Sequence, residues 1–386
     1  MIYLDNAATT PVSPAAAEAA RDAMLSGWGN PSARYPAGKA ARDRLLADRN
    51  VIAAALGCKP TRAIQTAPPE LIFTSCGSES DNWALRAGAE RGKRRGKHII
   101  TTAIEHAAVL ETCKALEGEG YEVTYLPPNR EGSIDPADFA AALRPDTILA
   151  SMMLVNNELG TVLPVRECAG LLKKANPQAL FHTDAVQAFL KIPFTPKALG
   201  VDMVSLSGHK VHAPKGVGAL YIREGLRLRP LIYGGGQEGG LRSGTEATAQ
   251  VAAFAAAVGQ QKCTFAQDTA QMEAVKALLL ARLAAELPEV TPIVVGEAPH
   301  ILALTMAGYK SEPLVQELGD KGICVSAGSA CHRGRPSHVY AALGLDKEQR
   351  EGAFRVSFSG QTRAEDVDAL VDALKVIRDT RFKSMS

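Results

Sequence analysis

Short apolar segments alternate with helical segments along residues 68–222, and this alternation constrains the fold more than any other feature of the chain. Amphipathic segments of helical periodicity lie at residues 81–94, 107–118, 136–143 and 164–175. Seven segments have the length and apolar character of buried strands: residues 71–74, 98–102, 122–125, 147–153, 179–183, 203–206 and 219–222. Apolar strands that alternate with helices form a mainly parallel sheet with both faces covered. The sequence therefore predicts an α/β fold.

A change of pattern divides the chain after a glycine-rich segment at residues 234–244. An alanine-rich helix is predicted from about residue 247 to 287, with a break near Cys263. Beyond Pro288 the pattern is α+β, with strands at 290–295, 301–306 and 353–357 and helices at 311–321 and 364–379. A chain of 386 residues is long enough for two domains. We expect a large domain over residues 14–260 and a smaller α+β domain formed by residues 1–13 and 261–386.

Composition excludes several classes of partner. The net charge is +2, which gives no electrostatic basis for direct binding of nucleic acid or of an anionic membrane. No apolar run reaches the roughly 18 residues that a bilayer span needs, and the N-terminus lacks the pattern of a secretion signal. The seven cysteines are scattered, without a CxxC pair, which argues against disulfides and a zinc site. We expect a cytoplasmic protein without a metal.

Lys210 is the most informative single residue. It follows the apolar run at 203–206 and the sequence Ser-Gly-His, and a Pro/Gly turn follows it. This places its amine at the exposed end of a buried strand, where a side chain reaches a ligand. A lysine there forms a Schiff base with a carbonyl cofactor such as pyridoxal phosphate. The alternative is a solvated lysine beside a turn, but Ser207 and His209 next to it favour a phosphate-binding site.

Four further motifs follow predicted strands. Residues 73–82 run from a strand through a small-residue turn into a helix, a geometry that binds an anion through free N–H groups. Asp184 follows another strand and suits a protonated pyridine nitrogen, with Gln187 one helical turn further. The imidazole of His106 and the amides of residues 156–157 end two other strands. Each motif alone also fits a helix cap or a structural residue, but ligands bind beyond the carboxyl ends of such strands, where all five motifs converge.

Cys331 lies in a small, polar stretch, residues 325–334, and not on a helix face. A reactive thiol needs exposure and a nearby cation, and His332, Arg333 and Arg335 supply candidates that would lower its pKa. The alternative, a small buried apolar residue, fits Cys324 better.

Taken together, these motifs closely resemble those of the cysteine desulfurases of the NifS/IscS type, within the class V, fold-type I pyridoxal-phosphate enzymes. The matching segments are in family order and span nearly the whole chain: residues 3–11, 29–32, 73–82, 105–106, 155–158, 182–187, 207–210, 242–245 and 329–331. The resemblance implies a fold-type I transferase, with a large mainly parallel-sheet domain and a smaller α+β C-terminal domain. It also implies conversion of L-cysteine to L-alanine, with the sulfur passed on as a persulfide.

The resemblance assigns roles at the cofactor residue by residue. Lys210 is similar to the Schiff-base lysine, His106 to the histidine stacked on the ring and active in proton transfer, and Asp184 to the partner of the pyridine nitrogen. Other residues match the neighbours of the cofactor's 3′-oxygen and its phosphate cup: Asn157 and Gln187 for the former, and Gly77, Ser78, Ser207 and His209 for the latter.

Further roles concern substrate, partners and sulfur. Arg355, with Asn157, matches the substrate site, where the arginine binds the α-carboxylate. Thr245 resembles the threonine that reaches the phosphate of a neighbouring subunit, which implies a homodimer with shared active sites. Cys331 falls at the persulfide-forming cysteine, so a sulfur-acceptor protein, for iron–sulfur cluster assembly or for thiolation of tRNA or cofactors, is the implied partner.

The chain departs from the family pattern in three places. Tyr35 stands where many relatives have histidine, Cys76 replaces a usual glycine in the phosphate turn, and the stretch after Cys331 reads His-Arg-Gly-Arg-Pro-Ser. A selenocysteine lyase or another class V aminotransferase is the alternative activity. A partner-binding subunit without catalysis is a third reading, against which Lys210, Asp184 and His106 argue.

Overall fold

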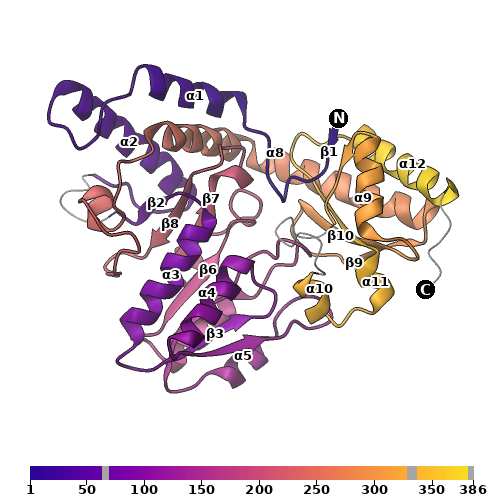
Figure 1. Cartoon of the computed structure of the whole chain (residues 1–386), viewed down its shortest axis with the longest axis horizontal. Helices are drawn as coiled ribbons and strands as arrows, with labels where there is room; N and C mark the ends of the chain where they lie inside the picture. The colour runs from indigo at the N-terminus through magenta and orange to yellow at the C-terminus, as the bar shows by residue number, and fades with distance from the viewer. Residues whose placement is uncertain (63–68, 328–336, 381–386) are drawn as a thin grey trace.

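The computed structural model describes residues 1–62, 69–327 and 337–380. Its largest element is a seven-stranded sheet in the order β2-β8-β7-β6-β5-β3-β4 (Figure 1). The neighbours from β7 to β4 are parallel, whereas β8 is antiparallel to β7 and β2. The mainly parallel sheet is therefore confirmed, and each predicted strand forms with its ends shifted by at most a few residues: β2 (Leu71–Thr74), β3 (His98–Thr102), β4 (Glu122–Leu126), β5 (Thr147–Ser151), β6 (Leu180–Asp184), β7 (Met203–Ser207) and β8 (Gly218–Ile222).

Both faces of this sheet are buried because successive side chains of a strand point to opposite sides. In β5, Leu149 packs into one hydrophobic core and Ala150 into another, and in β6 Leu180 and Phe181 divide in the same way. The helices α3 (Gly77–Gly92) and α4 (Ala107–Gly118) cover the first face. The second is covered by α5 (Pro136–Ala142), α6 (Val165–Ala175) and the first half of α8 (Thr248–Glu286).

The long helix α8 connects two cores. It packs against α1 (Pro14–Leu25) and α2 (Pro36–Ala55), two helices that the strand–helix alternation did not predict. Phe254 in its first half lies in the core of the large sheet, and Leu283 in its second half lies in the other core. The predicted break near Cys263 is wrong: the helix is continuous there. No proline interrupts residues 248–286, so nothing in the backbone forces a break.

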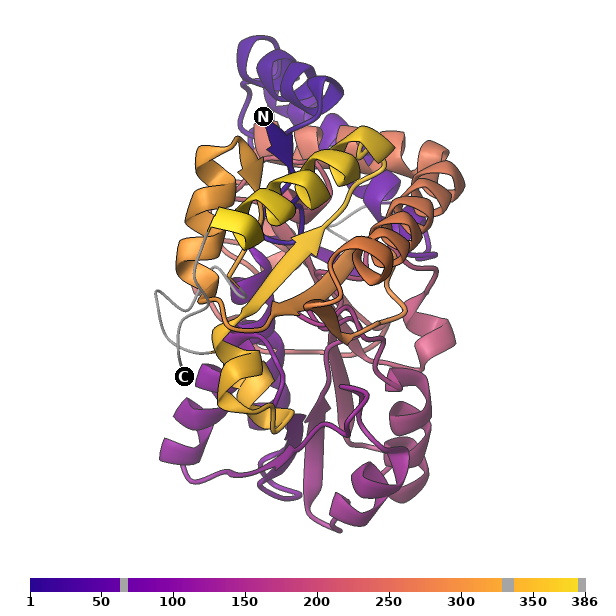
Figure 2. The same cartoon turned by 90° about the vertical axis from the view of Figure 1, so that its right-hand side faces the viewer.

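The second core surrounds a small antiparallel sheet of order β12-β10-β9, formed by β9 (Val290–Val294), β10 (Ile301–Met306) and β12 (Ala353–Ser357). The helices α9 (Ser311–Asp320) and α12 (Ala364–Thr380) pack into this core. The short helix α11 (Lys347–Glu351) contacts β10, whereas α10 (His338–Ala342) packs Val339 and Tyr340 into the first core. Figure 2 shows β12 with α12, in yellow, lying across it. The N-terminal strand β1 (Ile2–Tyr3) pairs with β11 (Ile323–Cys324), and Leu4 packs into this second core. The chain therefore starts beside its C-terminal part.

We propose the same domain division as the sequence suggested, residues 14–260 against 1–13 with 261–386. The composition of the second core supports it, because that core combines Leu4 with side chains from Met272 onward. The boundary then falls inside α8, and that helix joins the two domains as a single rod.

A buried ion pair fixes the glycine-rich segment against α2. The guanidinium of Arg49 donates to both carboxylate oxygens of Glu238, at 2.7 and 2.5 Å, and it lies 4.5 Å from the centre of the Phe73 ring. The backbone N–H of Phe73 also donates to Glu238. Both charged side chains are almost fully buried, so each depends on the other for its charge compensation.

Replacing Arg49 with methionine is expected to lower the free energy of unfolding by about 3–5 kcal/mol, because it leaves the Glu238 carboxylate buried without a cation. Urea unfolding of both proteins measures this difference. Arg44→Met is the matched control on the same helix: its pair with Asp48 is partly exposed, at 3.7 Å, so it should cost less than about 1 kcal/mol. Equal losses in the two variants would contradict the role of the buried pair.

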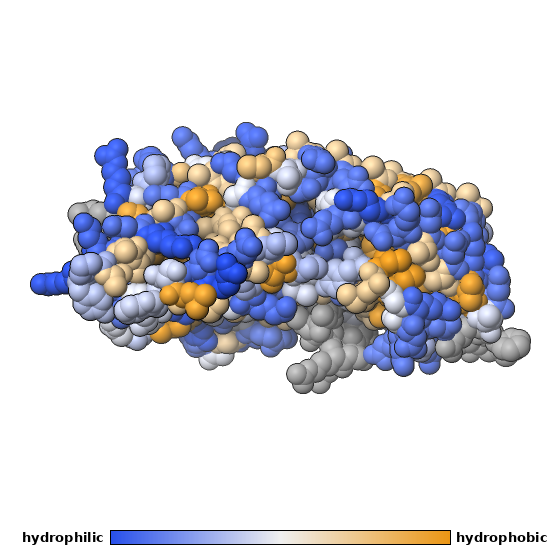
Figure 3. All heavy atoms as spheres, turned by 90° about the horizontal axis from the view of Figure 1, so that it is seen from above, coloured by the Kyte–Doolittle hydropathy of each residue, from blue (hydrophilic) through white to orange (hydrophobic). Residues whose placement is uncertain are grey.

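None of the helices in the described part of the chain is both long and apolar enough to span a bilayer. The face seen in Figure 3 mixes hydrophilic residues with smaller groups of hydrophobic ones.

Candidate active site

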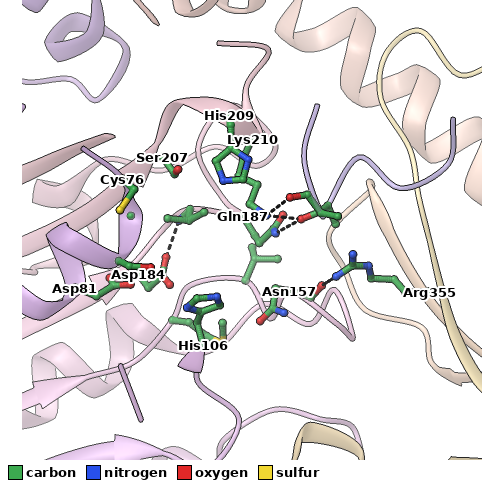
Figure 4. Close-up of a pocket in the computed structure, with 17 residues that line it drawn as sticks. Cys76, Asp81, His106, Asn157, Asp184, Gln187, Ser207, His209, Lys210 and Arg355 are labelled. Carbon is green, nitrogen blue, oxygen red and sulfur yellow. Dashed lines mark hydrogen bonds between the residues drawn. The ribbon is translucent and has the colours of Figure 1, made fainter. Parts of the chain in front are cut away.

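A cavity of about 230 Å³ lies between the carboxyl ends of the large-sheet strands and the small sheet. Figure 4 shows its side chains converging from both sides. Ten of the residues that the sequence singled out line it, and they come from segments that are far apart in the chain: Gly77, Ser78, His106, Asn157, Asp184, Gln187, Ser207, His209, Lys210 and Arg355. The predicted convergence of the strand-end motifs is therefore present in the structure.

Lys210 ends a short 3-10 turn, Gly208–Lys210, directly after β7. Its amine donates hydrogen bonds to the carbonyl oxygens of Ala7 (2.7 Å) and Ala8 (2.8 Å). The same N-terminal segment is held to the turn by Thr10, whose N–H and hydroxyl both donate to the carbonyl of His209. The local strand–turn sequence thus aims the amine into the cavity, and the N-terminal segment supplies its acceptors.

Asp184 is the last residue of β6 and is nearly buried. Its Oδ1 accepts a hydrogen bond of 2.8 Å from the N–H of Val186. Burial raises the pKa of this carboxyl, while His106 and Lys210 act in the opposite direction. Asp81, which also lines the cavity, is buried too, and burial together with Asp184 raises its pKa well above the usual range. A cationic group in the cavity would supply the charge that Asp184 lacks.

His106 caps the N-terminus of α4: its Nδ1 accepts a hydrogen bond from the N–H of Ala108 (3.1 Å). An imidazole that accepts at Nδ1 carries the proton of its neutral form on Nε2. In the view of Figure 4, His106 and His209 lie on opposite sides of the cavity.

The predicted anion site is built by the start of α3 and the end of β7. Gly77 opens α3, and a Cβ at this position would come within 2.9 Å of Val186 Cγ2, so glycine allows the helix to begin this close to its neighbours. Ser78 and Ser207 line the same part of the cavity. Burial lowers the pKa of His209 to about 4, with Lys210 and Lys215 adding to the effect, so its ring is neutral at pH 7. The first N–H groups of a helix attract a phosphate.

Arg355 projects into the cavity from β12 of the small sheet and is almost fully buried. Its Nη1 donates to the carbonyl oxygen of Asn157 (2.7 Å) and its Nη2 to Asp5 (2.9 Å). These contacts fix a guanidinium opposite Lys210, on the other domain, where it suits a carboxylate. The sequence did not indicate Asp5, Ala7 or Ala8 as site residues, although all three lie in the motif at residues 3–11.

Two predicted site residues remain. Thr245 is exposed and does not line the cavity of its own chain. Cys331 falls in residues 328–336, outside the described residues. Among the residues that the structure describes there is no cluster of three metal-ligand side chains.

Behind His106, the fully buried Glu105 accepts hydrogen bonds from the N–H of Met153 (2.9 Å) and the hydroxyl of Thr102 (2.8 Å). Burial raises its pKa from 4.5 to about 8, and Asp184 raises it further. Because the folded state binds this proton more tightly, the stability that Glu105 contributes is complete below about pH 4.5 and is lost as the pH rises towards 8.

We therefore expect the unfolding free energy of the natural chain, relative to that of Glu105→Gln, to fall between pH 5 and 8. The slope should approach about 1.4 kcal/mol per pH unit, because the glutamine cannot titrate. Chemical unfolding at a series of pH values measures it. Glu111→Gln, on the exposed face of α4, should give a flat difference. If the difference in unfolding free energy for Glu105→Gln were also independent of pH, the pKa of Glu105 would not be raised by folding.

Comparisons with known protein families, sequences and structures identify the family of this chain. The model of the family "Aminotransferase class-V" matches residues 2–370. The chain belongs to this family. A cysteine desulfurase IscS of Methanosarcina thermophila is 41% identical, over 97% of this chain and 91% of that protein. Among solved structures, a NifS-like protein is similar with a TM-score of 0.91 and 35% identity, over 98% of this chain and all of the other. The structure of SspA in complex with cysteine matches with a TM-score of 0.81 and 33% identity, over 94% and 100% of the two chains.

Class V family members of the cysteine desulfurase type use pyridoxal phosphate, and the cavity has a donor set that fits this group. A lysine amine suits its aldehyde, a buried carboxyl that lacks a full charge partner suits its ring nitrogen, and a helix start beside two serine hydroxyls suits its phosphate. Lys210, Asp184, Gly77, Ser78 and Ser207 supply these features in one cavity.

Proposed function

We propose that the chain is a pyridoxal-phosphate-dependent cysteine desulfurase, which converts L-cysteine to L-alanine and holds the sulfur as a persulfide on Cys331. The observation that carries the proposal is the cavity itself: Lys210, Asp184 and His106 face Arg355 across one space. The relatives named cysteine desulfurase support it over nearly the full length of the chain. The similar structure of SspA in complex with cysteine also supports the proposal.

Each cofactor contact has a candidate in the cavity. Lys210 would hold the cofactor covalently, Asp184 would pair with its ring nitrogen, and His106 would lie against the ring. Gln187 and Asn157 would be near the 3′-oxygen on the ring, and the phosphate would lie among Gly77, Ser78, Ser207 and His209. When bound, pyridoxal phosphate stabilises the negative charge that develops when the α-proton of an amino acid is removed.

The chain's own residues account for the remaining steps. Arg355 binds the α-carboxylate of L-cysteine, and its contacts to Asn157 and Asp5 fix its plane. The amine of Lys210 takes the α-proton. The thiolate of Cys331 attacks the substrate sulfur, an S–S bond forms, and the C–S bond breaks with its electron pair left on Cβ. Protonation of Cβ, for which His106 and Lys210 are the nearby groups, gives L-alanine. The net reaction transfers one sulfur atom and needs no external oxidant.

The assembly and setting are part of the same proposal. We propose a homodimer in which Thr245 from one chain completes the phosphate site of the other, which accords with its exposed position outside its own cavity. The persulfide would then pass to an acceptor protein for iron–sulfur cluster assembly or for thiolation. A thiol-based reaction of this kind suits the reducing cytoplasm.

Product analysis tests the reaction type. The purified protein is loaded with pyridoxal phosphate and incubated with L-cysteine and a thiol reductant, and amino acids, sulfide and keto acids are measured. The proposal predicts alanine and sulfide in equal amounts without a keto acid. A keto acid with the amino group transferred to the cofactor would instead show a transaminase.

A further inference from the structure

The backbone of Ala7 links the cavity to the small sheet. Its carbonyl oxygen accepts hydrogen bonds from the Lys210 amine (2.7 Å) and from Nε2 of Gln187 (2.9 Å). Its N–H donates to the hydroxyl of Ser357, the last residue of β12, at 2.9 Å. A single backbone unit therefore connects two cavity side chains to the strand that carries Arg355.

A buried histidine completes this set of contacts. Nε2 of His300 lies 3.3 Å from Oε1 of Gln187, and His300 is 1% exposed. A carbonyl oxygen only accepts, so the Gln187 atom that faces Ala7 is the amide nitrogen, and the atom that faces His300 is the oxygen. The hydrogen bond therefore requires a proton on Nε2 of His300.

The charge state of His300 agrees with this assignment. Burial holds its pKa well below the usual range, and the cationic side chains of Lys191, Lys276, Arg355 and Lys210 lower it further. The ring is thus neutral, with one proton, on Nε2. Its Nδ1 is buried and has no hydrogen-bond partner in the described part of the chain. Within that part, the ring therefore makes its side-chain hydrogen bond to Gln187 through Nε2.

The backbone around His300 lies beside Ser357, at the end of two paired strands. Ile301 pairs with Ser357 in the small sheet, and the N–H of Phe358 donates to the carbonyl of His300 (2.9 Å). Arg355 lies two residues before Ser357 in β12. His300 and Ser357 are therefore adjacent at one end of two paired strands, where they contact Gln187 and Ala7.

We propose that His300 is a positioning residue: it fixes the orientation of the Gln187 amide and, through Ala7, aligns Gln187 and Lys210 with Arg355. This inference rests on the function proposed above. A flipped amide would place its oxygen against the Ala7 carbonyl, a repulsive contact, and its NH₂ group against the Nε2 proton of His300 in the tautomer assigned above. In the held orientation one N–H of Gln187 binds Ala7, and the second remains as a donor for the 3′-oxygen of a cofactor in the cavity.

Two substitutions separate positioning from packing. His300→Leu fills a similar space without a donor, whereas His300→Gln places an amide N–H close to the position of Nε2. Thermal unfolding first confirms that both variants fold. The affinity of the cofactor-free protein for pyridoxal phosphate, the absorption maximum of the bound cofactor, and kcat and KM for L-cysteine are then measured.

We expect His300→Leu to weaken cofactor binding by about threefold to tenfold, the loss of one hydrogen bond, to shift the absorption maximum, and to lower kcat more than it changes KM. His300→Gln should restore all of these. Unchanged affinity and absorption in a folded His300→Leu protein, or equal defects in the two variants, would overturn the inference. If His300→Leu does not fold, His300→Asn, whose shorter amide does not reach Gln187, gives the same test.

The design separates the two proposals. If the natural chain forms no alanine but His300→Leu still alters cofactor affinity and absorption, the desulfurase proposal fails and the positioning role stands. If the natural chain forms alanine and His300→Leu matches it in every measurement, the positioning role fails alone.

Discussion

Replacing Lys210 with alanine is expected to reduce alanine formation from L-cysteine by roughly 10⁴-fold or more, a loss typical of removing a residue that forms a covalent intermediate. The amine of Lys210 enters the cavity from the end of β7, where Ala7 and Ala8 accept its hydrogen bonds. Without it, the protein has neither the covalent link to the cofactor nor the base that removes the α-proton.

Amino-acid analysis of timed reactions measures this loss. Lys215→Ala is the matched control, because Lys215 is exposed, lies five positions further along the chain and does not line the cavity. It should remain within a few-fold of the natural chain. If Lys210→Ala kept a tenth or more of the activity, another residue would have to be the base.

Replacing Cys331 with serine is expected to abolish sulfur transfer, with a fall in turnover of at least about 10³-fold. A serine hydroxyl is almost fully protonated at pH 7 and is a poor nucleophile towards sulfur, whereas a cysteine thiolate is a strong one. Cofactor binding should be unchanged, because the proposed cofactor contacts come from other residues, among them Lys210, Asp184 and Ser207. Absorbance of the bound cofactor and sulfide release with a reductant measure the two effects separately.

Two other cysteines serve as comparisons for Cys331. Cys263 is exposed on α8, and Cys263→Ser should have full activity. Cys76 lines the cavity as a second thiol. If Cys76→Ser lost sulfur transfer while Cys331→Ser retained it, the nucleophile would have to be reassigned to Cys76.

The sequence predicted the large sheet and the meeting of its strand-end residues in one cavity, because both follow from local patterns. The apolar runs around residues 98–102 and 203–207 form strands at those positions. Residues that directly follow parallel strands meet at one edge by the geometry of the sheet, so Asp184 and Lys210 converge as expected.

The features that the sequence missed depend on contacts between distant segments. The ion pair of Asp5 with Arg355 joins residues 350 positions apart, and the contact of Ala7 with Lys210 spans 203. Backbone carbonyl acceptors carry no side-chain signal at all. His300 lies outside every motif, and its contact with Gln187 joins residues 113 positions apart. The predicted break in α8 failed for a related reason, because packing against two cores stabilises a helix that local propensity alone leaves undecided.

A single-turnover experiment with L-cysteine and no reductant tests the central claim most directly. The cofactor-loaded natural chain and the Cys331→Ser variant are compared, with alanine counted per subunit and added sulfur located by intact mass and peptide mapping. The desulfurase account predicts about one alanine per site and one added sulfur on Cys331, both absent from the variant. Bound cofactor in both proteins, with neither alanine nor added sulfur in the natural chain, would contradict it.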